Sequence, residues 1–466
     1  MKNRNRSSRA AAILCMVTAL SGCAGLVRSD YVPPAVTTPA AWNHAQAKDD
    51  TAASPGTPWW RAFNDPQLDR LIDDVLKNNN NLAAAGILVK RAWLEAGLAA
   101  DKQRPALSAS ISNTHAYAMG GNATGSHSNS AAITLSYEAD LWGRLSSARD
   151  AAEWEAHATE QDRANTAWAL VATTTKLYWQ IAYLNQRVDL SEQNIAYARR
   201  SLAISQAKLE AGSVSPIDVA LSEQTLAAQE ADLTDLVQQR VEARNAMSIL
   251  FNAPPGKRIA ERSRLPEANL PAVAAGLPAE MLSRRPDLHA AELRLRETLA
   301  TADASRASYY PKLSLTGSLG SSSAALANVL TNPVASLGAG LTLPFLQWNE
   351  MRLTIQVSQA DYEKAVIDFR QTLYAAMADV ENALSARSQY LAQSEKLEKS
   401  LAAARVSEKL YALRYASGAI PLQTLLDAEQ TRRAAEIALV QNRYNRFANH
   451  VTLCQALGGN TEAASR

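Results

Sequence analysis

Several short segments of the chain alternate apolar and polar residues with a period of two. From Ala335 to Leu343, alanine and leucine occupy one set of alternate positions, and serine, glycine and threonine occupy the other. The same alternation runs through Leu107–Ser112 and Ile133–Glu138. It predicts two strand hairpins with small, polar loops at Gly120–Asn129 and Gly320–Asn332. A half-buried sheet of a soluble domain shows the same pattern, and four strands alone cannot close a barrel.

Two very long segments, Leu145–Ala211 and Glu350–Ser417, contain neither glycine nor proline. As continuous helices, each would be about 100 Å long at 1.5 Å per residue. The first carries a coiled-coil seam, with apolar residues every seven positions and mostly small residues three positions further on. The seam comprises Ile181, Val188, Ile195, Leu202 and Leu209, and then Leu184, Ser191, Ala198 and Ser205. Each segment ends at a glycine followed closely by a proline, and helix resumes to about Phe251 or Leu457, which predicts two helical hairpins.

The chain repeats itself at an offset of 206 residues. The matching positions are Pro105-Ala106-Leu107-Ser108 with Pro311-Lys312-Leu313-Ser314, Trp142 with Trp348, Gly212 with Gly418, and Gln224 with Gln430. Each copy runs strand, strand, long helix, tight turn, helix. Outside the copies, Asp65-Pro66 opens a pair of helices that reaches about Gln103, and the segment Arg284–Asp287 starts a helix with proline at its first position.

We expect the chain to comprise seven parts. They are a signal peptide (1–22), a lipidated tether (23–58), N-terminal helices (59–103), the first repeat (104–251), a crossover segment with a helix (252–309), the second repeat (310–457) and a tail (458–466).

The N-terminus has the three parts of a secretory signal: a basic stretch ending at Arg9, an apolar run, and the sequence Leu20-Ser21-Gly22-Cys23. The apolar run is about half the ~20 residues that a membrane-spanning helix needs. Leu-Ser-Gly-Cys resembles the bacterial lipobox, which implies a covalent lipid on Cys23. Ala24 follows the cysteine, and by resemblance to the sorting rule for bacterial lipoproteins this favours the outer membrane. We expect no other cofactor. Cys15 leaves with the signal, so Cys454 stands alone without an intrachain disulfide, and its apolar helical surroundings favour a core position.

Composition argues against several other classes of function. Removal of the first 22 residues takes away four basic side chains, so the net charge of +2 becomes −2, which gives no support for a nucleic-acid partner. The six histidines show no paired metal spacing, and neither a phosphate loop nor a Gly-x-Ser-x-Gly elbow is present. Ser205 and Lys208 fit a serine–lysine pattern, but they lie on the coiled-coil seam. We therefore expect neither an enzyme nor a metal site.

Four local motifs, taken in order, resemble the TolC-like outer-membrane efflux family, in particular the lipoprotein (NodT-type) branch of RND-type efflux systems. They are Trp59-Trp60 with Phe63 and Asp65-Pro66, Leu141-Trp142-Gly143-Arg144, Arg284-Arg285-Pro286-Asp287, and Tyr310-Pro311-Lys312-Leu313-Ser314. The resemblance covers essentially the whole mature chain. One departure is the segment Leu343–Asn349, where many relatives have an Asp-Gly-Gly turn before the helix.

The resemblance implies a fold that is mostly α with β. Four strands from each of three chains would form a twelve-stranded outer-membrane β-barrel, continuous with a long periplasmic α-helical barrel and belted by a small mixed equatorial domain. It also implies a passive exit duct of a tripartite efflux pump, lipid-anchored in the outer membrane of a Gram-negative bacterium. The partners implied are two further copies of the chain, outer-membrane lipid, a periplasmic adaptor protein and an inner-membrane transporter.

The resemblance places the gate in the second helical turn, Tyr411–Gln430, where Asp427 matches the acidic residue that rings the aperture. Gln423, Arg414 and Tyr415 are candidate contacts that hold the hairpins shut. A solvated position on a helix face explains Asp427 equally well.

The turn residues Gly212, Pro216, Gly418 and Pro421 are candidates for contact with the adaptor, although glycine and proline there also serve simply to make tight turns. The rival function is a lipid-tethered, adhesin-like coiled coil, which does not explain two strand hairpins at one offset. No residue identifies the cargo.

Overall fold

The computed structural model describes residues 27–45, 58–117, 125–273, 275–276, 278, 284–325, 328, 331 and 333–458. The expected signal peptide and the lipidation site Cys23 lie outside these residues. The chain divides into two compact units. The first comprises Met1–Val36, Ile87–Gln161 and Leu288–Thr372, and the second comprises Thr37–Gly86, Asp162–Asp287 and Leu373–Arg466.

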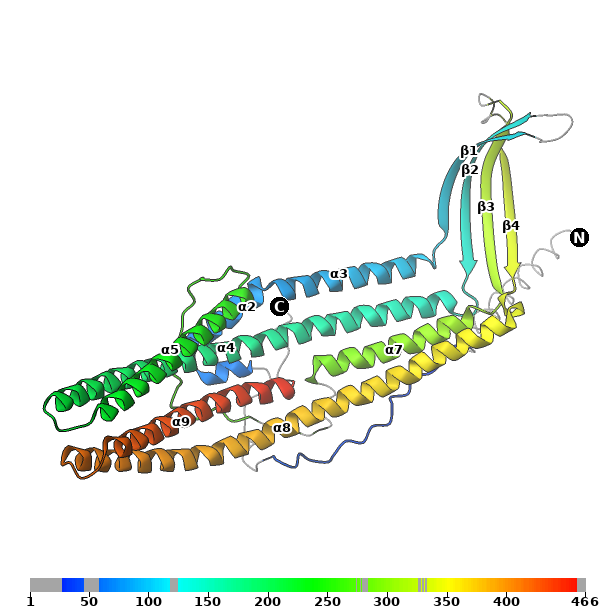
Figure 1. Cartoon of the computed structure of the whole chain (residues 1–466). Coiled ribbons are helices and arrows are strands. Elements are labelled where there is room, and N and C mark those ends of the chain that lie inside the picture. Colours follow the sequence, from blue (N-terminus) through cyan, green and yellow to red (C-terminus); the bar gives the residue numbers. More distant parts are fainter. Residues whose placement is uncertain are drawn as a thin grey trace, which may run out of the picture. The chain divides into compact units, whose positions relative to one another are not determined.

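The first unit carries a four-stranded antiparallel sheet in the order β1-β2-β3-β4, as Figure 1 shows. Its strands are β1 (Ala106–Tyr117), β2 (Gly125–Ala139), β3 (Lys312–Ser323) and β4 (Val334–Thr342). The register confirms the predicted alternation: Ala109 lies opposite Ile133, which lies opposite Leu319, which lies opposite Ala335. Because directly paired residues project from the same face, these side chains form one apolar face and the intervening serines and threonines form the other.

The predicted hairpin loops were too long. β2 already begins at Gly125, and β3 continues to Ser323, so strand pairing extends into both stretches that were expected to be loops. Small polar residues do not break the ladder, because they bond across it. Ser112 and Ser130 share a hydrogen bond of 2.7 Å, and the side-chain amides of Asn113 and Asn129 lie 2.5 Å apart.

The motif Leu141–Arg144 lies at the sharp corner between β2 and the long helix that follows it. The Asp140 carboxylate accepts hydrogen bonds from the backbone N–H groups of Leu145 and Ser146, which caps the helix start. The indole N–H of Trp142 donates to the Pro311 carbonyl at 2.9 Å, and this bond ties the two halves of the sheet together. At the second corner, where the sequence departs from the Asp-Gly-Gly turn of the family, the chain forms a short 3-10 turn, η6 (Pro344–Leu346).

The helices follow the predicted order. α4 (Arg144–Glu210) and α8 (Trp348–Ala416) have 67 and 69 residues, so each is about 100 Å long. They are followed by α5 (Pro216–Leu250) and α9 (Leu422–Ala456), and the other elements are η3 (Trp59–Phe63), α2 (Pro66–Asn78), α3 (Asn80–Asp101) and α7 (Pro286–Ala307). The predicted seam is confirmed in α4, where Val188, Ile195 and Ser205 are buried.

The core of the second unit is rich in aromatic residues from both ends of the chain. Phe63 contacts Trp179, Phe447 and His450, with ring centroids 5.2 to 6.1 Å apart. Burial lowers the pKa of His450 to about 4, with a further contribution from the charge of Arg387. Asp65 in this core is the N-cap of α2: its carboxylate accepts hydrogen bonds from backbone N–H groups of the first helical turn.

Candidate gate and hairpin turns

Both helical hairpins turn through the same local structure. α4 ends before Gly212 and α8 before Gly418, and the φ angles of these glycines, 72° and 75°, lie in the left-handed region. In the first turn, the N–H of Ser213 donates to the Lys208 carbonyl five residues earlier at 2.9 Å, and the second turn has the equivalent bond. This is the Schellman arrangement, which favours glycine because of its φ.

The two prolines follow these glycines at the starts of the returning helices. Pro216 is the first residue of α5, which begins with a capping box: the Ser215 hydroxyl accepts from the backbone, and the Asp218 carboxylate accepts from the N–H of Ser215. Pro421 precedes α9, which has no side-chain cap. Turn formation therefore accounts for all four predicted tip residues, and contact with an adaptor stays a prediction.

The structure brings two of the four predicted gate residues together. The side-chain amide of Gln423 donates to the Asp427 carboxylate at 2.7 Å, one helical turn away on α9, and both side chains are exposed. Arg414 is also exposed, near the end of α8, and makes no ion pair with any residue that the structure describes. Exposure of Asp427 agrees both with a pore-facing residue and with a solvated helix face.

Tyr415 packs inside the hairpin instead. It contacts the buried leucines at the start of α9, Leu422, Leu425 and Leu426. The ammonium of Lys208 lies over the Tyr415 ring, 4.1 Å from its centroid, so the tip of α4 is attached to the tip of α8.

The serine–lysine pattern of α4 is used in packing. The Ser205 hydroxyl shares a hydrogen bond of 3.1 Å with the Ser222 hydroxyl of α5, and Lys208 makes the contact with Tyr415.

A groove of about 420 Å³ lies among α4, α5 and α9. Gln423, Asp427 and Arg433 line it from α9, Asn194 from α4, and Gln224 from α5, in an otherwise mixed wall of polar and aliphatic side chains. The predicted gate pair therefore lies on the rim between the two hairpins of one chain.

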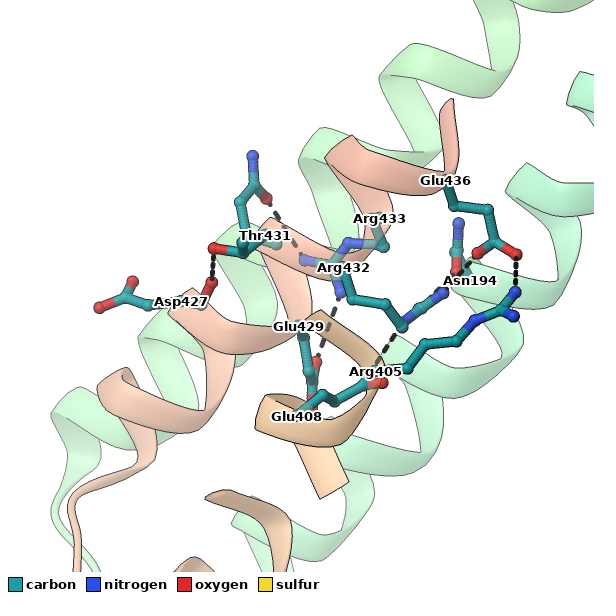
Figure 2. Close-up of polar contacts among 10 residues, drawn as sticks. Asn194, Arg405, Glu408, Asp427, Glu429, Thr431, Arg432, Arg433 and Glu436 are labelled. Atoms are coloured by element: carbon teal, nitrogen blue, oxygen red, sulfur yellow. Dashed lines mark hydrogen bonds and ion pairs between the residues drawn. The ribbon is translucent and has the colours of Figure 1, made fainter. Parts of the chain in front are cut away.

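A network of charges that includes Asn194 of this groove joins α4, α8 and α9 (Figure 2). The Arg432 guanidinium lies 3.0 Å from Glu408 on α8, 2.6 Å from Glu436 on α9, and 3.2 Å from the side-chain oxygen of Asn194 on α4. Arg405 of α8 also pairs with Glu436 at 3.0 Å. Figure 2 shows Asp427 pointing away from this network.

One ion pair of the network is almost completely buried. Arg433 Nη1 lies 3.4 Å from Glu429 Oε2, and their side chains are only 8% and 2% exposed. Burial raises the pKa of Glu429 and lowers the pKa of Arg433, because each charge has lost its water. Burial, followed by the nearby Glu429 carboxylate, raises the pKa of Tyr197 to about 12.

Sequence reasoning missed Glu408, Glu429, Arg432 and Arg433. A local signal was present, because the pairs Glu429/Arg433 and Arg432/Glu436 are each spaced four residues apart. That spacing is common on exposed helix faces, however. Only packing against α4 and α8 distinguishes this buried pair from a surface pair.

None of the helices in the described part of the chain is both long and apolar enough to span a lipid bilayer. Within the same residues, no group of three or more histidine, cysteine and acidic side chains is arranged to hold a metal ion.

The profile of a family described as outer membrane efflux protein matches residues 71–253 and 277–459, which is more than half of the chain. The chain belongs to this family. It is 30% identical over 453 residues to the pyoverdine export outer membrane protein OpmQ of Pseudomonas putida, covering 94% of this chain and 96% of that protein. It is 31% identical to toxin and drug export protein A of Aggregatibacter actinomycetemcomitans, covering 83% of this chain and 85% of that protein.

A further relative is the probable outer membrane lipoprotein SilC of Salmonella typhimurium, at 25% identity over 94% of this chain and 96% of that protein. Among solved structures, the outer-membrane channel OprN superimposes with a TM-score of 0.85 at 24% identity, covering 93% of this chain and 99% of that channel. The family confirms the predicted function: the chain is the outer-membrane exit duct of an efflux pump in a Gram-negative bacterium. The adhesin-like rival is set aside.

Proposed function

We propose that three copies of the chain close into one efflux duct, to which each copy gives its four strands. The observation that carries this proposal is the state of the sheet edges. β1 and β4 lie at the two ends of the sheet, and each has one edge without a partner strand in the described residues. Hydrocarbon does not tolerate unpaired backbone groups, so the sheet needs other copies to close it into a barrel of three times four strands.

The polarity of the two sheet faces supports this barrel. On the apolar face Leu107, Ile111 and Leu337 are 73%, 86% and 94% exposed in the single chain, whereas serines such as Ser318 and Ser336 line the other face. An outer-membrane barrel presents its apolar face to lipid and its polar face to the lumen. This assignment explains why so much apolar surface is open to solvent in one copy alone.

The helices of the first unit also present apolar side chains with no partner. Leu94 and Leu98 of α3 and Val357 and Ile367 of α8 are 60% to 67% exposed. Exposed apolar faces of this size mark an interaction surface. In the trimer they lie between neighbouring copies.

An internal duplication supports an α-helical barrel made from six hairpins. The two matches to the family profile begin at residues 71 and 277, which is the offset of 206 found in the sequence. The paired hairpins α4/α5 and α8/α9 have nearly equal lengths. The terminal and crossover segments would then form the mixed equatorial domain around this barrel.

We assign the gate to the second hairpin, α8/α9. Three Asp427 carboxylates around the aperture would narrow it and favour cations at its mouth, with Gln423 fixing the rotamer of each. Arg432 would hold α9 against α4 and α8 in the closed state, because its contacts join all three helices. Glu429 would add to this through its side-chain hydrogen bond with Tyr197 of α4, and Arg433 would balance the charge of Glu429 within α9. The turns at Gly212 and Gly418 would then contact the periplasmic adaptor protein.

A lipid on Cys23 would attach the tether to the outer membrane, as the similarity to a probable lipoprotein supports. The names of the relatives mention pyoverdine in one case and toxins and drugs in another. Similar ducts therefore carry different cargoes, and we assign selectivity to the transporter that the duct serves.

The proposal is tested by the native mass of the mature protein in detergent and by two matched substitutions on β4. Leu337→Arg places a charge on the lipid face, which should cost about 2–4 kcal/mol and reduce the amount of folded trimer. Ser336→Arg, one residue away on the lumen face, should leave the trimer intact and lower its conductance. A stable monomer, or equal tolerance of both substitutions, would contradict the trimeric barrel. Cys23→Ala should leave the barrel inserted, because the strands do not depend on the lipid.

A further inference from the structure

Two histidines meet across the first strand hairpin of the sheet. His115 on β1 lies directly opposite His127 on β2 in the register. Their ring centroids are 4.3 Å apart, and the rings are perpendicular at 85°. Directly opposed residues of an antiparallel pair project from the same face, so the two imidazoles are direct neighbours on one face of the sheet. In the sequence, the six histidines show no paired metal spacing, and His115 and His127 are twelve residues apart.

Both histidines are exposed on the sheet surface. Neither ring forms a hydrogen bond or ion pair with another side chain among the residues that the structure describes, so their nitrogens are free to take a ligand. Two other histidines differ in this respect, since His44 contacts Glu381 and His157 bonds Glu160 at 3.2 Å.

The row of side chains that contains the pair changes from apolar to polar along β1. Leu107 and Ile111 belong to its apolar part, whereas Asn113, His115 and Tyr117 follow toward the hairpin loop. At about 3.4 Å per residue, His115 lies roughly 14 Å beyond Ile111. The histidines therefore stand at the polar end of the face, where dissolved ions reach them.

We infer that His115 and His127 together bind one divalent transition-metal ion, with Cu²⁺ bound more tightly than Ni²⁺ or Zn²⁺. Neutral imidazole nitrogen is a preferred ligand of these ions at about 2.0–2.1 Å, and affinity for nitrogen sites rises to Cu²⁺ along the first row. Two protein ligands leave the other positions to water, so the ion exchanges. While bound, it links β1 to β2 next to the hairpin loop. The site lies within one hairpin of one chain and is independent of the proposed trimer.

The test is a calorimetric titration of the mature, full-length protein in detergent with Zn²⁺, using a preparation without a polyhistidine tag. We expect one ion per chain. Loss of a residue that merely supports a metal ligand weakens binding about 10–100-fold, so loss of a ligand itself in His115→Gln or His127→Gln should weaken it at least about tenfold. His157→Gln is the matched control, a partly exposed histidine with a carboxylate neighbour, and should leave the titration unchanged.

Two measurements on the wild-type protein keep the inference falsifiable if a variant folds poorly. The electron paramagnetic resonance spectrum of bound Cu²⁺ should show two nitrogen ligands. Zn²⁺ should also protect His115 and His127, but not His157, from chemical modification by diethyl pyrocarbonate. Absence of Zn²⁺ binding, binding that survives in both single variants, or modification of the pair that Zn²⁺ does not slow would overturn the site.

Discussion

The buried ion pair between Glu429 and Arg433 has two unequal halves. Removing one partner of such a pair leaves a buried charge and typically costs about 3–5 kcal/mol. The stranded groups differ, however, because a carboxylate can take up a proton, whereas a guanidinium cannot lose one in a protein. Glu429→Gln should therefore weaken the packing of α9 more than Arg433→Met does.

The size of the difference follows from the burial of the two side chains, which are 2% and 8% exposed. In Glu429→Gln, a loss of about 3–5 kcal/mol corresponds to an increase of roughly 10²–10⁴-fold in the population with α9 detached. In Arg433→Met, Glu429 takes up a proton and so avoids being a buried charge without a partner. The free-energy cost of this protonation is about 1.4 kcal/mol for each unit by which the pH exceeds the pKa of Glu429. Burial already raises that pKa, and loss of the arginine charge raises it further.

The pH dependence has a definite sign. With its folded-state pKa above the unfolded value, Glu429 binds a proton in folded Arg433→Met that the unfolded chain releases. The stability of Arg433→Met therefore rises as the pH falls through the raised pKa, whereas Glu429→Gln shows no such recovery. Replacing both residues by leucine and methionine should be neutral or stabilising by about 1–4 kcal/mol.

Hydrogen exchange of peptides from the first half of α9 at pH 6 and pH 8, corrected for intrinsic exchange rates, measures how often α9 detaches. Single-channel conductance shows whether this detachment opens the duct. The matched control is Asp368→Asn, which breaks an exposed pair with Lys364 at the same four-residue spacing and should leave exchange in α9 unchanged. Equal exchange in Glu429→Gln and Arg433→Met, without a pH effect in the second, would refute the reasoning.

Three further predictions concern buried groups of the second unit. His450 takes up a proton at about pH 4 when folded and near pH 6.5 when unfolded, so about 3 kcal/mol of stability should be lost between these values as the pH falls, and His450→Phe should abolish this loss in thermal melts. Burial raises the pKa of the Cys454 thiol to about 12, so a maleimide should label it only after denaturation. Asp65→Ala removes a helix cap and the buried hydrogen bond that Tyr178 donates, which should lower the free energy of unfolding by about 3 kcal/mol and speed hydrogen exchange in α2. Asp65→Asn should be less destabilising.

Each of these has a clear contrary result. Unchanged acid sensitivity in His450→Phe would show that other groups dominate the loss. Labelling of Cys454 at the rate of a free thiol would mean that the helix opens often under native conditions. Asp65→Ala with wild-type exchange in α2 would show that solvent replaces the lost bonds at no cost.

The sequence predicted those parts of the protein that depend on local energies. Alternation with period two located four strands, and the absence of glycine and proline located two helices of nearly 70 residues. Gly212 and Gly418 marked both turns because the left-handed φ that ends a helix favours glycine at each. The predicted ends of β2 and β3 were wrong, since serine and asparagine suit loops and also form hydrogen bonds across a ladder.

Tertiary structure alone decided which distant residues meet. Tyr197 lies beside Glu429, more than 200 positions later, and Asn194 likewise bonds Arg432, because α4 and α9 pack in one particular register. His115 and His127 face each other because the hairpin pairs them, whereas a register shifted by one residue would separate them onto opposite faces. Periodicity along the chain shows which face of an element is apolar, but it does not show which other element packs against this face. The charges of the buried network and the histidine pair therefore acquire their properties only when the chain is folded.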